Sequence, residues 1–306
     1  MSTGINICGS CALLTSIALG CTVSTTYALA AESGDDVIGR LEYHTVQSDE
    51  NLLLIARRHD LGYIEIVAAN PGIDPWLPPP GRTVILPKAH ILPHAPRTGM
   101  VINLPELRLY YFGDGAGTVI THPIGVGRKG RETPIGTTQI VRKREAPTWI
   151  PPASIRAERP ELPISVPPGP DNPLGAYALD LGWQSYVVHG TNRPFGIGRR
   201  VSGGCIRLYP EDIEHLFAIV SVGTPVTVVD QAVKLGWSGG HLFMEVHPDA
   251  VEGDQLERTG WLIPAPIPDL ERRVRSFAGA AAKRVDWPSV RAVARHKRGI
   301  PVQITK

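Results

Sequence analysis

Seven short segments rich in β-branched and aromatic residues follow one another between Val101 and Val229, and each is bounded by Gly, Pro or Asp. This pattern is typical of β-strands. The segments are 101–104, 107–112, 118–124, 137–141, 176–181, 186–189 and 224–229. We therefore expect a mainly β (α+β) chain whose central part, residues 97–230, is a β-sandwich-like domain.

One helix interrupts these strands. Pro210 stands at its first turn and is followed by two acids, which suit the positive end of the helix dipole. Apolar residues recur at helical spacing and predict a buried face, formed by Ile213, Leu216, Phe217 and Val220. We expect His215 on another face, exposed to solvent and paired with Glu211 four residues earlier.

The segment from Pro147 to Pro173 is rich in proline and has almost no periodicity. It is predicted to contain no regular element and to form a long, semi-rigid loop. Its apolar side chains are available to dock on the domain: Trp149, Ile150, Leu162 and Ile164. These favour a lid over a disordered segment.

Residues 41–88 form a separate compact unit. The sequence predicts a strand at 43–46, a helix around 51–59, a second helix around 63–69 and a strand at 83–86. Asp49 and Asn51 are plausible caps for the first helix, and Asn70-Pro71-Gly72 ends the second. The order is therefore β-α-α-β.

Residues 231–306 extend the chain beyond the central domain. They begin with a strand candidate at Leu242–Val246, and from Gly253 onward eleven Lys or Arg residues stand against five acids. We expect a basic tail, which is either a solvated helical surface or a contact with an anionic envelope.

The N-terminal segment, residues 1–30, is apolar and ends in Ala28-Leu29-Ala30, a pattern typical of a secretory signal peptide. No Lys or Arg precedes the apolar run, which departs from that pattern. A lipid anchor at Cys21 is the alternative. Both alternatives predict export, and we expect a periplasmic protein. The net charge of +2 is too small to indicate a nucleic-acid partner.

Cleavage after Ala30 would leave Cys205 as the one thiol of the mature chain. Gly203 and Gly204 precede it, and glycines let a substrate carbonyl approach the main chain. The N–H groups of Gly204 and Cys205 are candidate donors to an oxyanion.

A nucleophilic thiol also needs a base or a positive charge nearby, and His189 and Arg207 are the candidates. His189 ends a strand just before Gly190, and we expect a backbone carbonyl to fix its tautomer. The competing interpretations are a merely buried cysteine and a zinc site with His241 or His247.

The segment HGTNRPFGIGRRVSGGCIRL, with MVINLPELRLYYF and THPIGVGRKGRETPIGTT upstream, resembles the L,D-transpeptidases of the YkuD type, and more closely their ErfK/YbiS subgroup. The unit at 41–88 is similar to LysM domains, which bind the N-acetylglucosamine of glycan strands. The resemblance implies Cys205 as nucleophile and His189 as proton donor and acceptor, with oxyanion donors at Gly204 and Cys205. Supporting positions in the same motif are Ser202, Gly203, Arg207 and Gly190. Many members carry a second histidine where this chain has Gly203.

The resemblance also implies the reaction. Cys205 would attack the amide before the terminal D-alanine of a peptidoglycan tetrapeptide stem, release D-alanine and hold the stem as a thioester for transfer to an amine. No metal or organic cofactor is implied, and carbapenems would acylate the thiol. The acceptor stays open between a lysine of an outer-membrane lipoprotein, a second stem and, in a hydrolase, water. An inert glycan-binding protein is the remaining alternative.

Overall fold

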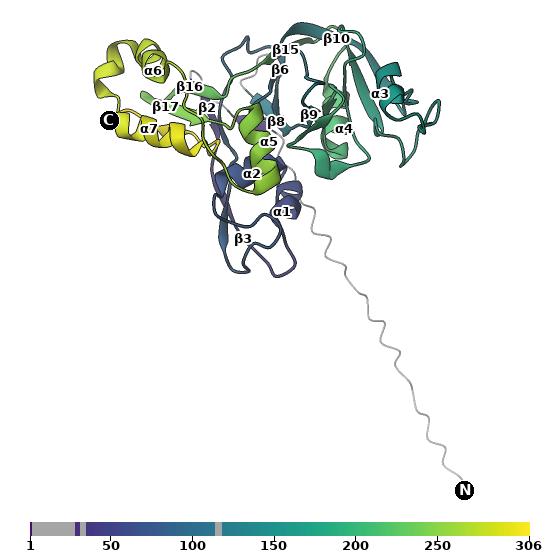
Figure 1. The fold of residues 1–306 in the computed structure, drawn as a ribbon, viewed down its shortest axis with the longest axis horizontal. Coiled ribbons are helices and arrows are strands. Elements are labelled where there is room, and N and C mark those ends of the chain that lie inside the picture. Colours follow the sequence, from purple (N-terminus) through teal and green to yellow (C-terminus); the bar gives the residue numbers. More distant parts are fainter. Residues whose placement is uncertain (2–27, 31–34, 114–117) are drawn as a thin grey trace.

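The structure is a computed structural model that describes residues 1, 28–30, 35–113 and 118–306. The described chain forms an N-terminal unit, a central β-domain and a C-terminal unit (Figure 1). None of the helices in these described ranges combines the length and the apolar character that crossing a membrane requires.

The N-terminal unit has the predicted β-α-α-β order. Its elements are β3 (Glu42–Thr45), α1 (Leu52–Arg58), α2 (Tyr63–Ala69) and β4 (Thr83–Leu86). The two strands pair antiparallel. Asn51 caps α1 as predicted, because its Oδ1 accepts a 2.9 Å hydrogen bond from the Leu54 N–H. A short ribbon of β2 (Val37–Gly39) and β5 (Ala89–Ile91) joins this unit to the rest of the chain.

The central domain contains a nine-stranded sheet in the order β1-β8-β7-β6-β15-β10-β11-β12-β14 and a two-stranded sheet of β13 and β9. The strands are β1 (Ala28–Ala30), β6 (Gly99–Asn103), β7 (Arg108–Phe112), β8 (Thr118–Pro123), β9 (Val126–Gly127), β10 (Gly136–Glu145), β11 (Tyr177–Leu181), β12 (Val187–His189), β13 (Arg200–Ser202), β14 (Ile206–Arg207) and β15 (Pro225–Val229).

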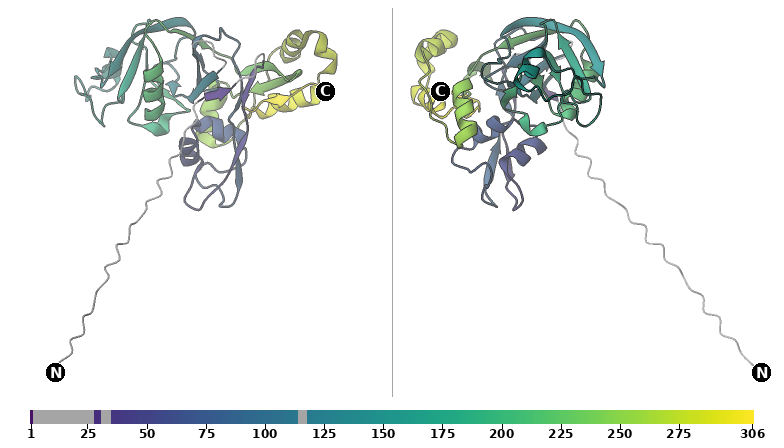
Figure 2. Two further views of the ribbon diagram at one scale, coloured as in Figure 1. Left: turned by 180° about the vertical axis from the view of Figure 1, so that it is seen from behind. Right: turned by 45° about the vertical axis from the view of Figure 1, so that its right-hand side comes forward.

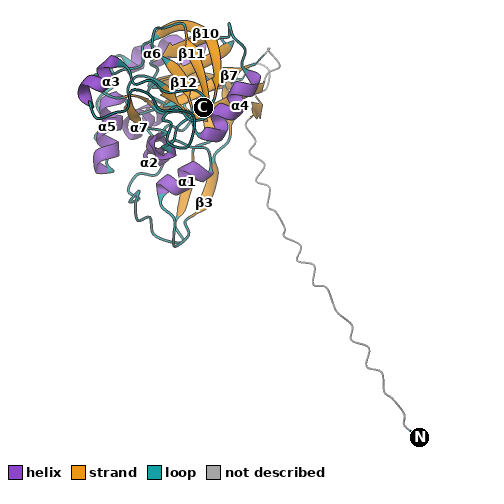
Figure 3. Cartoon of the chain, turned by 90° about the vertical axis from the view of Figure 1, so that its right-hand side faces the viewer, coloured by secondary structure: helices purple, strands orange, loops and turns teal. Residues whose placement is uncertain are grey.

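The long strand β10 belongs to both layers of this domain. Its first half, residues 136–139, pairs with β15, and its second half, from Ile140 onward, pairs with β11. The register shifts between Ile140 and Arg142, and such an irregularity bends a strand and increases its twist. The sheet thereby folds over a shared core, which confirms the predicted mainly β, sandwich-like class. The helix α4 (Pro210–Ile219) packs against β11 (Figure 3).

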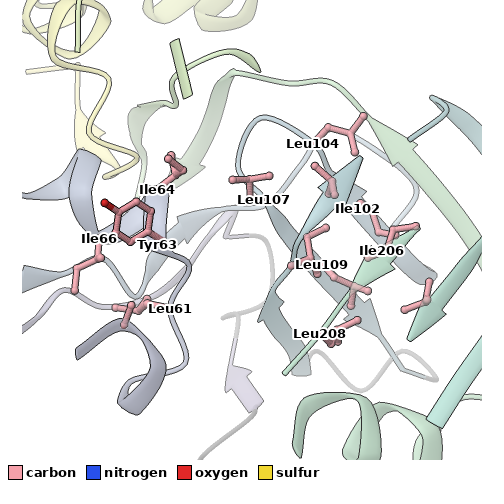
Figure 4. Packing of buried hydrophobic residues seen from close by; sticks show 14 of the residues in the cluster. Leu61, Tyr63, Ile64, Ile66, Ile102, Leu104, Leu107, Leu109, Ile206 and Leu208 are labelled. Atoms are coloured by element: carbon pink, nitrogen blue, oxygen red, sulfur yellow. The ribbon is translucent and has the colours of Figure 1, made fainter. Parts of the chain in front are cut away.

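The N-terminal unit and the central domain share one hydrophobic core. Side chains from α2, including Ile66, belong to the same buried cluster as Ile102 of β6 and Ile206 of β14 (Figure 4). A buried ion pair crosses the same boundary, with Arg108 Nη2 at 2.8 and 2.7 Å from the two carboxylate oxygens of Glu65. The N-terminal unit is therefore packed firmly against the central domain and is not connected to it by a linker alone.

The C-terminal residues form a folded unit that contains three helices, which agrees with the helical surface expected as one of the two alternatives for this segment. The elements are β16 (Val233–Ser238), β17 (His241–Val246), α5 (Ala250–Thr259), α6 (Leu270–Ala278), the 3-10 turn at Gly279–Arg284, α7 (Trp287–His296) and β18 (Val302–Gln303). Met244, Val274 and Val290 lie in a separate core. Val274 and Ala278 on α6, and Val290 and Val293 on α7, are spaced at three or four residues, so each helix turns an apolar stripe toward this core. The part of the C-terminal unit that contains α6 lies on the side of the central domain opposite α3 (Figure 2).

Most of the predicted signal peptide, including Cys21, lies outside the described residues. Its last three residues, Ala28–Ala30, form β1 and pair antiparallel with β8, with Ala28 opposite Ile120.

Candidate active site

Cys205 occupies the turn between β13 and β14. Gly204, just before it, has φ +116°, and a Cβ at this position would lie 3.0 Å from Cε1 of Tyr186. Glycine is therefore needed both for the backbone conformation and for space. The Thr133 hydroxyl donates to the Gly204 carbonyl at 2.8 Å, and the Ser202 hydroxyl donates to the Cys205 carbonyl at 2.6 Å. These two bonds hold the cysteine turn from both sides.

The Gly204 N–H is already engaged, which corrects the expectation that it is a free oxyanion donor. It donates to Ser202 Oγ at 3.1 Å. The short Ser202 side chain folds back on its own turn, as serine does in local side-chain to backbone motifs. The Cys205 N–H is thus the predicted donor that remains.

The thiol of Cys205 is partly exposed, and its Sγ donates to the Ser185 carbonyl at 3.6 Å. Burial raises the pKa of this thiol, while the nearby Arg207 guanidinium acts in the opposite direction. Cys205 is the free cysteine among the described residues. At rest, the group is therefore a neutral thiol.

His189 ends β12 and is 4% exposed. Its Nδ1 lies 2.6 Å from the Gly190 carbonyl oxygen, so Nδ1 carries the proton and Nε2 keeps its lone pair. This contact confirms the predicted backbone acceptor. Burial, and then the charge of Arg207, lower the pKa of His189 to about 3. The imidazole is therefore neutral at physiological pH.

β12 and β14 bring the site together by pairing in parallel, with His189 opposite Arg207. Both side chains line, with Cys205, a cavity of about 500 Å³. The Cys205 thiol donates to the Ser185 carbonyl in this state, so transfer of its proton to Nε2 requires the S–H to leave that carbonyl. Apo active sites often show such looser geometry.

The segment 147–173 covers one side of this cavity and contains a helix, which corrects the prediction that it has no regular element. The helix is α3 (Ala153–Glu158), and Ile155 from it lines the cavity with Trp149. The prolines flank the helix rather than interrupt it, so they do not exclude it. Asn172 anchors the base of the segment, donating at 2.7 Å to the Pro147 carbonyl.

Two arginines of the preceding loop hold α3 in place. Arg128 and Arg131 donate to the two carboxylate oxygens of Glu158, at 2.7 and 2.5 Å. Arg131 also lines the cavity. The lid predicted from the apolar residues of this segment is thus held by an exposed ion-pair cluster.

Glu211, the predicted partner of His215, accepts two hydrogen bonds from Arg57 of α1. The His215 ring lies 6.1 Å from the ring of His122 on β8. The contact between Arg57 and Glu211 joins the N-terminal unit to α4, which the sequence of the helix alone cannot reveal.

Among the residues that the structure describes, two groups have donor sets that suit metal ions: His90, Glu106 and Glu245, and Asp60, His122 and Asp212. Neither group lines the catalytic cavity. In the first, Lys234 Nζ lies 2.8 Å from Glu106 and 3.1 Å from Glu245, so an ammonium occupies the position between the carboxylates. In the second, His122 lies between Asp60 and Asp212, at 3.6 and 3.3 Å. Burial and the neighbouring Asp60 raise the pKa of Asp212 to about 7.

Two residues that contact the cysteine turn, Thr133 and Ser185, were not among the predicted site residues. Thr133 lies in the RETPIG segment that carries part of the family resemblance, so its motif was a usable signal. Ser185 contacts the thiol through its backbone carbonyl. Any residue would supply this group, so no side-chain pattern in the sequence could have indicated the position.

Comparison with known proteins gives consistent matches. Residues 97–228 match the family described as the L,D-transpeptidase catalytic domain. The chain is 40% identical to the probable L,D-transpeptidase ErfK/SrfK of Escherichia coli K12 over 98% of this chain and 97% of that protein. It is 43% identical to the probable L,D-transpeptidase YbiS of the same strain, over 92% of each. Among solved structures, it is similar to the catalytic domain of the Enterococcus faecium L,D-transpeptidase, with 25% identity, a TM-score of 0.36 and coverage of 45% of this chain and 100% of that one. On the strength of the near full-length relatives, the chain belongs to the L,D-transpeptidase family.

Proposed function

We propose that the chain cleaves the amide before the terminal D-alanine of a peptidoglycan tetrapeptide stem, with Cys205 as nucleophile, and transfers the stem to an amine. The observation that carries this proposal is the placement of Cys205 and His189 in one cavity, with the imidazole oriented by the Gly190 carbonyl.

The first half-reaction uses the neutral thiol and imidazole of the resting state. His189 Nε2 accepts the thiol proton while Sγ bonds to the carbonyl carbon of residue three. The Cys205 N–H faces the oxygen that gains negative charge. When the C–N bond breaks, His189 returns its proton to the leaving nitrogen, so D-alanine departs as a neutral amine and the stem remains as a thioester.

The second half-reaction reverses these proton movements. An acceptor amine attacks the thioester carbon, His189 takes a proton from the nitrogen, and the thiol is regenerated with that proton. Every proton moves between the substrate and His189 or Cys205, so this scheme uses no cofactor. The lid with Trp149 and Ile155 supports aminolysis over hydrolysis, because it covers the cavity where the thioester would form.

The acceptor is a separate proposal. The chain is similar to ErfK/SrfK and YbiS over nearly its whole length. The resemblance to this subgroup favours, as acceptor, a lysine of an outer-membrane lipoprotein over a second stem. Both acceptors present a primary amine to the same thioester. Export to the periplasm, through removal of residues 1–30, follows from this substrate, since the wall lies outside the cytoplasm.

Glycan binding by the N-terminal unit is supported by a groove of about 350 Å³, which residues of this unit line together with residues at the end of α5. Trp76 and Trp261, 53% and 66% exposed, line it with polar residues such as Asp74 and Glu257. Exposed aromatic faces flanked by hydrogen-bonding groups suit the apolar face and the hydroxyls of a sugar. Because this unit is fixed to the catalytic domain, a bound strand would hold its stems near the cavity.

The test is release of D-alanine from a tetrapeptide stem by the purified chain, with and without an amine acceptor. Wild type is expected to release D-alanine and to form the amide product when the acceptor is present, while Cys205→Ala, at unchanged thermal stability, releases none. Release by Cys205→Ala at the wild-type rate would contradict the proposal. Formation of free tripeptide alone, at every acceptor concentration, would show a hydrolase.

A further inference from the structure

The guanidinium of Arg207 lines the catalytic cavity without a partner. No hydrogen bond or ion pair joins it to another described residue, and its Nε is buried. Burial lowers the pKa of this arginine, which means that the cation is poorly solvated in the empty cavity. An unpaired cation in such a place is costly to keep unless a ligand compensates it.

The other charges around the cavity do not neutralise Arg207. Arg131 forms its ion pair with Glu158, and Glu132, also at the cavity wall, is exposed and accepts a 2.7 Å hydrogen bond from the Gly130 N–H. His189 and Cys205 are neutral at rest, as shown above. None of these groups pairs with Arg207, so its guanidinium remains an unpaired cation at the cavity wall.

The position of Arg207 relative to the nucleophile defines what it would contact. Cys205 directly precedes β14 and Arg207 ends it, and both residues line the cavity. Residues two apart in an extended chain have Cα atoms about 7 Å apart, so a substrate held at Sγ is within reach of the Arg207 side chain. In an L,D-acyl donor, carboxylates occur within a few bonds of the scissile amide.

Resting on the proposed function, we propose that Arg207 is a substrate-binding residue that recognises a carboxylate of the acyl donor. The planar guanidinium donates two parallel hydrogen bonds to a carboxylate. The carboxylate has two sources: the terminal group of the leaving D-alanine and the side chain of residue three, where that residue has an acidic group. A carboxylate bound to Arg207 also offsets the positive charge that the guanidinium exerts on Cys205 and His189.

The experiment compares three donors: the free-acid tetrapeptide, the same peptide ending in D-alaninamide, and the peptide with the residue-three side-chain carboxyl amidated. The kcat/KM of each is measured with wild type, Arg207→Gln, Arg207→Lys and, as a distant control, Arg291→Gln, whose exposed side chain lies on α7. Folding of every variant is checked by thermal unfolding.

Wild type and the control are expected to prefer the free acid over one of the two amides by about 10- to 100-fold, the range for losing a charge-assisted hydrogen bond. The amide whose kcat/KM falls by this factor shows which carboxylate Arg207 binds. In Arg207→Gln the preference falls to within about twofold, and Arg207→Lys keeps part of it. Any effect of Arg207 on the thiol slows all three donors equally and does not change the ratio.

A preference that persists unchanged in Arg207→Gln and Arg207→Lys, or a wild type that does not distinguish the three donors, would overturn the inference while leaving the proposed function intact. Failure of wild type to release the leaving residue from any donor is a different result, since it removes the proposed function itself.

Discussion

Replacing Gly204 by alanine tests how the cysteine turn is built. The residue has φ +116°, where an L-residue is strained by about 1 to 3 kcal/mol. The new Cβ would lie 3.0 Å from the Tyr186 ring, a contact that either the ring or the turn must relieve. We expect a loss of about 1 to 3 kcal/mol in the free energy of unfolding, measured by urea denaturation.

The effect on the reaction should be larger than the effect on stability. The peptide between Gly204 and Cys205 carries the Cys205 N–H, and a turn that shifts moves this donor away from the developing oxyanion. Loss of one oxyanion donor typically reduces kcat by about 10²- to 10³-fold. We expect Gly204→Ala to lower the rate of D-alanine release by at least the smaller factor.

Gly203→Ala is the matched control. The backbone of Gly203 is outside the left-handed region, and an added Cβ would approach only the tip of the Ile155 side chain, at 3.3 Å. That tip can rotate away, so the rate should stay within about threefold of wild type. Equal rates for Gly203→Ala and Gly204→Ala would refute the role assigned to the turn.

Three further changes have defined outcomes. Arg108→Met leaves the Glu65 carboxylate buried without its partner, which should cost about 3 to 5 kcal/mol in urea unfolding; the double variant with Glu65→Met should recover most of this, and a loss below about 1 kcal/mol in the single variant would contradict a rigid boundary. The pKa of His189 is about 3 in the folded chain against 6.5 in the unfolded chain, so unfolded molecules bind more protons between these values and stability falls as the pH drops from 6.5 toward 3. His189→Gln should reduce the slope of unfolding free energy against pH by up to about 1.4 kcal/mol per pH unit, and an unchanged slope would show that the imidazole is not buried in its neutral form. Glu158→Gln removes the ion pair that holds α3 to Arg131, and the ratio of hydrolysis to aminolysis, measured by mass spectrometry, should rise; a constant ratio would show that the lid does not exclude water.

The strands and the N-terminal unit could be predicted because their signals are local. Asn51 caps α1 as expected, and the β-branched runs that end at His189 and Val229 became β12 and β15. The neighbourhood of Cys205 and His189 could also be predicted, since the motif contains both residues and the sheet pairs β12, which carries His189, with β14, which directly follows Cys205.

What could not be predicted depends on contacts between distant segments. Glu211 pairs with Arg57 of the N-terminal unit, so the helical spacing to His215 was misleading. The engagement of the Gly204 N–H by Ser202 depends on a side-chain rotamer that no sequence pattern specifies. The basic residues after Gly253 suggested a tail because charge counts do not reveal that Val274 and Val290 meet the β16–β17 ribbon in a common core.

Intact-protein mass spectrometry of the enzyme during turnover tests the central claim most directly. Without an amine acceptor, we predict a species heavier than the free chain by the tripeptide acyl group, which localises to the peptide containing Cys205 and disappears when an amine acceptor is added. His189→Gln should form this species far more slowly, and Cys205→Ala should not form it. A wild-type chain that releases D-alanine without any acyl adduct at Cys205 would contradict the account.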